Sequence, residues 1–141
     1  MFDNDKLGDR QELIRALNEV GLEAREFVTD DGKKKVIVPL LDMGYTTPIV
    51  AAENPELRTY LVQAAKSWSH QTYLYISTQR LAGETQVGVL GDHAEIGEKF
   101  SSKIWKSVSS VETAVAAFQD LWEQRDTWLN NFMTQVGKSE A

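Results

Sequence analysis

The chain has 141 residues, 42% of them hydrophobic and 26% charged, and this globular composition excludes a disordered or fibrous protein. The 15 basic and 21 acidic residues give a net charge of -6, which opposes nonspecific binding of nucleic acid. Cys is absent, and this excludes disulfides, thiolate metal sites and cysteine nucleophiles.

The chain shows no internal division. No linker rich in Pro, Gly and Ser and no long repeat interrupts it, so the sequence predicts a single domain over residues 1–141. Its ends, residues 1–8 and 137–141, are expected to be flexible. Because no run of 18 apolar residues is present and the acidic start lacks the pattern of a signal peptide, we expect a cytoplasmic protein outside the membrane.

Three helices are expected. The first covers Glu12 to Gly21, preceded by a capping-box pattern that begins at Asp9. The second begins at Asn54-Pro55-Glu56, where an N-cap residue, a Pro and an acid follow one another, and runs to Trp68. The third begins at a second capping-box pattern, Ser109-Ser110-Val111-Glu112, and runs to Val136 as one long helix.

The strands alternate with these helices in blocks. Turn residues at Asp30-Asp31-Gly32 and at Ala82-Gly83 favour hairpins, and hairpins pair their strands antiparallel. The expected strands are Leu22 to Thr29, Lys33 to Leu40, Thr46 to Ala51, Thr72 to Thr78 and Thr85 to Leu90, with Lys103 to Val108 either a strand or irregular. The order α-β-β-β-α-β-β-(β)-α predicts an α+β fold, with an antiparallel sheet of about five strands covered by helices mainly on one face.

The last helix carries the strongest functional signal. Ten apolar residues lie on one broad stripe, four of them aromatic, and a lone domain of this size is not expected to cover them all. We therefore predict that this helix binds another protein and that the chain forms a two-fold homodimer. The predicted partner-binding residues are Phe118, Trp122, Arg125, Trp128, Leu129 and Phe132.

Catalytic patterns are weak by comparison. Asp92, His93, Glu95 and Glu98 lie within seven residues and could hold a divalent cation, although a solvated loop is the simpler interpretation. His93-Ala94-Glu95 matches half of the zinc deaminase signature, but that family needs thiolates that this chain lacks. His70 lies close to Ser67 and Ser69 without a nucleophile motif, and we interpret it as a residue at a helix end. No catalytic, cofactor or metal site is predicted.

Two further features bear on nucleic acid. Lys33-Lys34-Lys35 is the only basic run, and at a hairpin tip it is typically a solvated edge. Tyr73 and Tyr75 alternate as base-stacking aromatics would, but no RNA-binding motif accompanies them. Nucleic acid is therefore not an expected partner.

The layout resembles that of the type III secretion chaperones and related small acidic bacterial proteins. The match lies in element order, size and charge, with Pro55 to Trp68 as the second helix and Val111 to Phe132 as the last. The stretch from Gly91 to Val108 is longer than the pattern expects. The resemblance implies a cytoplasmic, dimeric protein that holds segments of other proteins.

Three functions follow as hypotheses. The first is a non-enzymatic, chaperone- or adaptor-like module that binds a protein through apolar grooves and sheet edges. The second is an acidic inhibitor, encoded by a phage or plasmid, that occupies a cationic target through Glu23, Glu26, Asp30, Asp31 and the loop from Asp92 to Glu98. The third is a small metal-dependent hydrolase that uses that same loop.

Overall fold

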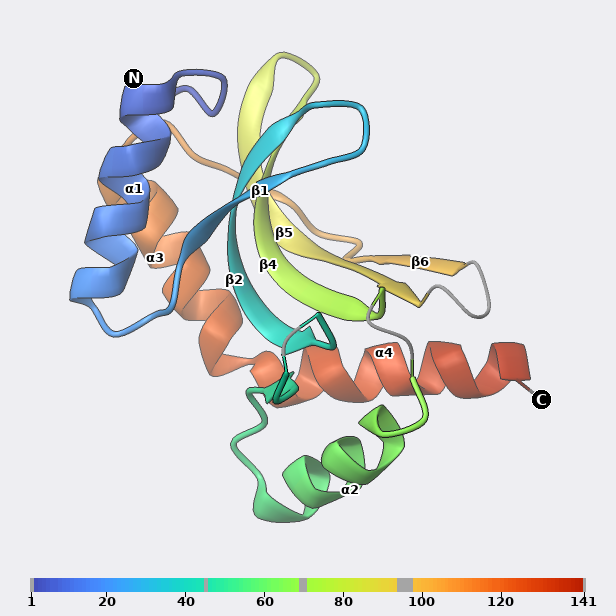
Figure 1. Ribbon diagram of the computed structural model, residues 1–141. Helices are drawn as coiled ribbons and strands as arrows, with labels where there is room; N and C mark the ends of the chain where they lie inside the picture. The colour runs from blue at the N-terminus through green and yellow to red at the C-terminus, as the bar shows by residue number, and fades with distance from the viewer. Residues whose placement is uncertain (1, 45, 69–70, 94–97, 141) are drawn as a thin grey trace. The chain divides into compact units, whose positions relative to one another are not determined.

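The predicted α+β fold class is confirmed, although the sheet has seven strands where about five were expected. The computed structural model describes residues 2–44, 46–68, 71–93 and 98–140, and over these residues it shows four helices and a mainly antiparallel sheet of seven strands (Figure 1). The elements are α1 Leu7–Glu19, β1 Arg25–Val28, β2 Lys34–Asp42, β3 Ile49–Val50, α2 Pro55–Ala65, β4 Tyr73–Leu81, β5 Glu84–His93, β6 Glu98–Ser101, β7 Lys106–Ser107, α3 Val111–Glu123 and α4 Arg125–Glu140. The strand order is β1-β2-β4-β5-β6, with β3 also paired to β2 and β7 to β5.

The chain falls into two compact units. Unit 1 comprises Met1–Val38, Ile76–Gly88 and Ser102–Glu123, and unit 2 comprises Pro39–Tyr75, Val89–Ser101 and Gln124–Ala141. The strands β2, β4 and β5 each contribute residues to both units. The single domain over residues 1–141 therefore stays a prediction.

In unit 1, α1 packs beside α3 and also contacts β1 (Figure 1). Leu13 and Leu17, one helical turn apart on one face of α1, are completely buried, as is typical of an amphipathic helix. The helix starts at Leu7, earlier than expected, because the Asp9 carboxylate accepts the backbone N–H of Asp3 and does not cap α1. Gly21, with φ +90°, follows its end as predicted.

The first residues of unit 1 differ from the predicted flexible end. Phe2 is 5% exposed and donates its backbone N–H to the Ser109 carbonyl at 2.9 Å. Asn4 is 3% exposed, its Nδ2 donates to the Lys34 carbonyl at 3.0 Å, and its Oδ1 accepts from the Thr78 hydroxyl at 2.6 Å. Sequence periodicity does not show such anchoring, because these bonds join residues far apart in the chain.

Both predicted hairpins are present. Gly32 turns β1 into β2 with φ +85°, and Ala82 and Gly83 turn β4 into β5 with φ +51° and +80°, the geometry that a two-residue turn demands. Pro39 lies inside β2 and does not end it. It lies between the β2 residues that pair with β1 and those that pair with β3, where a missing N–H is tolerated.

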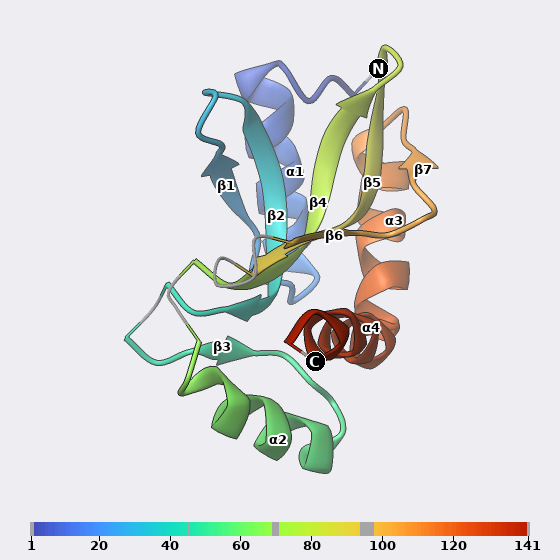
Figure 2. The same ribbon diagram turned by 90° about the vertical axis from the view of Figure 1, so that its right-hand side faces the viewer.

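In unit 2, α2 packs on β3, and α4 packs on β6 (Figure 2). The predicted N-cap of α2 is confirmed, since the Asn54 side chain accepts the N–H groups of Glu56 and Leu57 at 2.8 and 3.2 Å. This helix ends at Ala65, before the predicted Trp68.

The long last helix is the main error of the sequence analysis. It is two helices, α3 and α4, separated by Gln124. The next residue, Arg125, interrupts the apolar stripe in the sequence. The start of α3 is shifted by one residue, because the Ser110 hydroxyl accepts the N–H of Thr113. The undecided stretch Lys103 to Val108 contains the short strand β7, and β6 precedes it.

Candidate functional site

The six residues predicted to bind a partner lie on α3 and α4, and half of them belong to the core. Phe118 and Leu129 are completely buried, and Phe132 is 2% exposed. The Phe132 ring meets Phe100 of β6 edge to face, with ring centroids 6.0 Å apart. The partner-binding prediction is corrected at these three positions, because their own chain already covers them.

Trp122 and Trp128 are partly exposed. Trp122 lies in the last turn of α3, and Trp128 lies one turn into α4. The indole Nε1 of Trp128 is buried and finds no hydrogen-bond acceptor within the described ranges. These two Trp side chains are therefore more exposed than Phe118, Leu129 and Phe132 on the same helices.

Arg125 has a role inside the chain. Its Nε donates to the Ala51 carbonyl at 2.7 Å, and its guanidinium lies 3.9 Å from the Glu53 carboxylate. The neighbouring Asp126 accepts the backbone N–H groups of Glu53 and Asn54 at 2.7 and 2.9 Å. The first two residues of α4 therefore hold the loop that leads into α2, and the assignment of Arg125 to a partner stays a prediction.

The second helix, α2, leaves part of its apolar surface exposed. Leu61 and Ala65 are completely buried, but Tyr60 is 58% exposed, and Leu57 and Ala64 are half-buried. Leu57, Tyr60 and Ala64 follow the spacing i, i+3 and i+7 and so lie on one helical face. We call these three residues the α2 strip.

The two tyrosines considered for base stacking are used internally. Tyr73 and Tyr75 stack on each other, with ring centroids 4.6 Å apart and planes 19° apart. The Tyr75 hydroxyl donates to the Asp42 carboxylate at 2.5 Å, and both residues are buried. This Asp–Tyr pair had no sequence signal, because its members are 33 positions apart.

The acidic loop that contains His93, which was considered for metal binding but not predicted as a metal site, is only partly described. His93 is completely buried, and its ring meets Trp68 edge to face at 5.5 Å. Glu95 and the His70 of the sequence analysis lie outside the described residues, as does the side chain of Glu98. Among the side chains that are described, no three His, Asp or Glu residues lie close enough to hold a metal ion.

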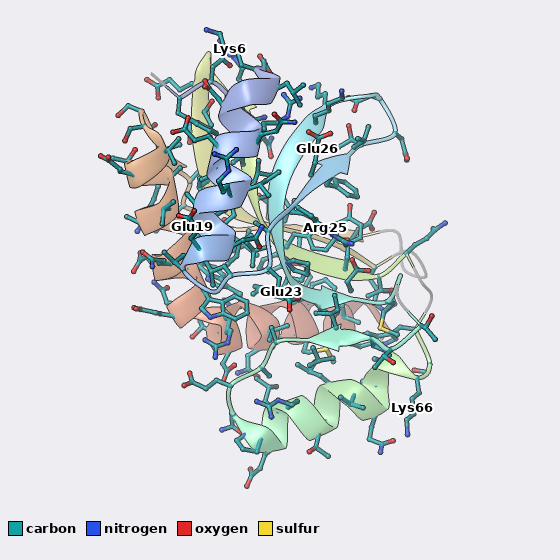
Figure 3. The ribbon with its side chains drawn as sticks, turned by 60° about the vertical axis from the view of Figure 1, so that its left-hand side comes forward. Lys6, Glu19, Glu23, Arg25, Glu26 and Lys66 are labelled. Atoms are coloured by element: carbon teal, nitrogen blue, oxygen red, sulfur yellow. The ribbon has the colours of Figure 1, made fainter. Side chains whose placement is uncertain are left out.

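Two acids of the inhibitor hypothesis are paired within the chain. Glu26 of β1, labelled in Figure 3, accepts from the Nε of Arg10 at 3.1 Å. Asp31 accepts a hydrogen bond from the Thr29 hydroxyl and lies 3.9 Å from the Lys33 ammonium. The hydrogen bond from Thr29 is the largest cause of a lowered pKa at Asp31.

None of the helices in the described ranges is both long enough and apolar enough to cross a bilayer. Comparison of the chain with protein-family models, with curated proteins and with solved structures found no match.

Proposed function

We propose that the protein is a non-enzymatic protein-binding module and that its partner docks on the α2 strip. The observation that carries this proposal is the exposure of Tyr60, which is 58%, on a helix whose neighbouring residues Leu57 and Ala64 are also only partly covered. Tyr is enriched at protein interfaces, because its ring supplies contact area with little loss of conformational entropy.

The helix that carries the strip is firmly held. Its N-terminus is capped by Asn54, and the loop before it is bound by Arg125 and Asp126. The Arg58 side chain also donates from Nε and Nη2 to the Ala52 carbonyl, at 3.0 and 2.7 Å. A surface that is ordered before binding loses less entropy when a partner docks, and this favours recognition by α2.

The strip suits a narrow partner. Three residues along one ridge match a single helix or an extended segment of another protein. A stable dimer buries about 800 Å² on each side, which is far more than three side chains supply. A homodimer is therefore not part of this proposal, since the residues on which it was expected include three that are buried.

The chaperone-like resemblance adds limited support. The observed order of elements matches the expected one up to β5, and then departs from it through β6, β7 and the division of the last helix. The inhibitor hypothesis is weakened because Glu26 and Asp31 already have cationic partners. Protein binding through α2 requires neither the resemblance nor these acids.

Photo-crosslinking in the native host tests this function. A photoreactive phenylalanine analogue placed at Tyr60 is expected to capture one protein, and the same protein is expected from position 57. The matched control is Val62, which is 40% exposed on the same helix and, two residues from Tyr60, faces away from the strip. Equal capture of the same proteins from positions 60 and 62, or no capture at 60, would contradict the proposal.

Affinity for the captured protein gives the quantitative test. Tyr60→Ala is expected to weaken binding at least tenfold, because large buried aromatic anchors dominate interface energies. Val62→Ala is expected to leave the dissociation constant within twofold. Wild-type affinity in the Tyr60→Ala variant would show that the partner docks elsewhere.

A further inference from the structure

A pocket in unit 1 gathers positive charge in an acidic protein. It has a volume of about 580 Å³ and is lined by the N-terminal segment, α1, the β1–β2 hairpin and the end of β4. Five of its lining residues are cationic: Arg10, Lys33, Lys34, Lys35 and Arg80. Three of these cations, Arg10, Lys33 and Arg80, pair with carboxylates of the same chain, which has a net charge of -6.

One of these cationic side chains, Arg10, is buried and held by hydrogen bonds within the protein. Arg10 is 4% exposed, and its guanidinium donates to the Glu26 carboxylate at 3.1 Å and to the Asn4 carbonyl at 2.8 Å. A guanidinium carries five N–H donors, so these two bonds fix its orientation and leave donors for a further acceptor. The pocket therefore contains a charged group whose conformation is set before any ligand arrives.

The other paired cations are held weakly. Arg80 contacts Asp3 and Asp5 at 2.9 and 3.1 Å, and the Asp5 side chain is 64% exposed. Lys33 lies 3.9 Å from Asp31, and both side chains are more than 60% exposed. Exposed pairs of this kind contribute little stability. A dianion can therefore replace the aspartates, because it brings two charges and several acceptor oxygens to the same cations.

Two observations narrow the class of anion. The Gln79 Oε1 atom is buried and accepts no hydrogen bond within the described part of the chain, although Gln79 lines the pocket. A ligand hydroxyl would supply the missing donor. The volume lies in the range of small-molecule sites and exceeds what a bare phosphate fills. A long polyanion is disfavoured, because the rest of the chain is strongly acidic.

We propose that this pocket binds a phosphate monoester of a hydroxylated small molecule, with its phosphate on Arg10, Lys34 and Arg80 and a hydroxyl on Gln79. Lys34 is central to this assignment, because it has no ion-pair partner among the described residues. The site is separate from the α2 strip and does not depend on the proposed function.

Isothermal titration calorimetry on the whole chain tests the ligand class, with ribose 5-phosphate, inorganic phosphate, ribose and a single-stranded oligonucleotide as probes at matched ionic strength. Ribose 5-phosphate is expected to bind saturably and more tightly than inorganic phosphate, and ribose is expected not to bind. Three results would each overturn the proposal: no saturable binding of ribose 5-phosphate below 10 mM, equal binding of ribose, or tighter binding of the oligonucleotide.

Matched variants test the location. Lys34→Gln is expected to raise the dissociation constant for ribose 5-phosphate about tenfold, as the loss of one charge-assisted bond does. Lys66→Gln makes the same change of net charge at an exposed residue after α2, in unit 2 (Figure 3). This control is expected to leave the dissociation constant for ribose 5-phosphate within twofold of the wild-type value. Circular dichroism confirms that both variants are folded. If the two substitutions raise the dissociation constant equally, binding depends only on the net charge of the protein, and the proposed location is wrong.

Discussion

Two helices of unit 2, α2 and α4, have similar apolar patterns and very different surroundings. In α4, Leu129 and Phe132 are buried almost completely, whereas in α2 the Tyr60 side chain is 58% exposed. The α4 side chains meet β6 and β5, where Phe100 and Gly91 lie against Phe132. An apolar stripe therefore shows which side of a helix is to be covered, and the opposing strands decide how completely it is covered.

The largest expected effect is at the buried helix. Phe132→Ala should lower the free energy of unfolding by about 3–5 kcal/mol, because it leaves a cavity between α4 and β6. Tyr60→Ala, the corresponding aromatic change on α2, should change it by less than about 0.5 kcal/mol. Urea denaturation of both variants measures the difference. Similar losses would contradict the contrast between the two helices.

The next effect tests how tightly β5 packs against β4. A Cβ atom added at Gly91 would lie 2.8 Å from the Tyr73 carbonyl oxygen and 2.7 Å from the Leu74 side chain. Gly91→Ala should therefore lower the free energy of unfolding by about 1–3 kcal/mol through overpacking. Gly8→Ala is the control, since nothing lies within 4 Å of that position in α1. A Gly91→Ala variant as stable as the wild type would show that β5 tolerates the added methyl group.

A smaller effect tests how α4 supports α2. Asp126→Ala removes the acceptor of the Glu53 and Asn54 N–H groups, and we expect it to cost about 1–2 kcal/mol. Amide hydrogen exchange should become faster in α2. Asn131→Ala, at an exposed position of α4, is the control and should leave the exchange unchanged. Unchanged exchange in Asp126→Ala would mean that these bonds do not hold α2.

The smallest effect lies in unit 1, at the exposed β1–β2 turn. The hydrogen bond from Thr29 lowers the pKa of Asp31 below its ordinary value of 3.8. The ionised carboxylate therefore stabilises the fold above that ordinary value, and this contribution is lost as the pH falls through the lowered pKa. Thr29→Val should raise the pKa of Asp31 toward 3.8 in an NMR titration, whereas Thr59→Val, on α2, should not. A pKa of Asp31 that stays lowered in Thr29→Val would assign the shift to other groups.

Local sequence signals determined much of the fold. The Asn54-Pro55 start of α2 and the turns at Gly32 and Ala82-Gly83 depend on backbone conformations that only a few residue types favour. The α+β class follows from the order of these elements, because each signal acts within a few residues. The boundary at Arg125 was visible as an interruption of the apolar stripe, although its meaning as a helix break was not.

Tertiary structure alone decided which apolar and polar groups are covered. Phe132 is buried because β6, more than 30 positions earlier in the chain, lies against it. The spacing of apolar residues in α4 does not predict this contact. Asn4 is held by hydrogen bonds to Lys34 and Thr78. Arg10, Lys34 and Arg80, from three distant segments, line one pocket. Contacts between distant segments depend on which strands pair and in which register, and a short stretch of sequence does not predict that pairing.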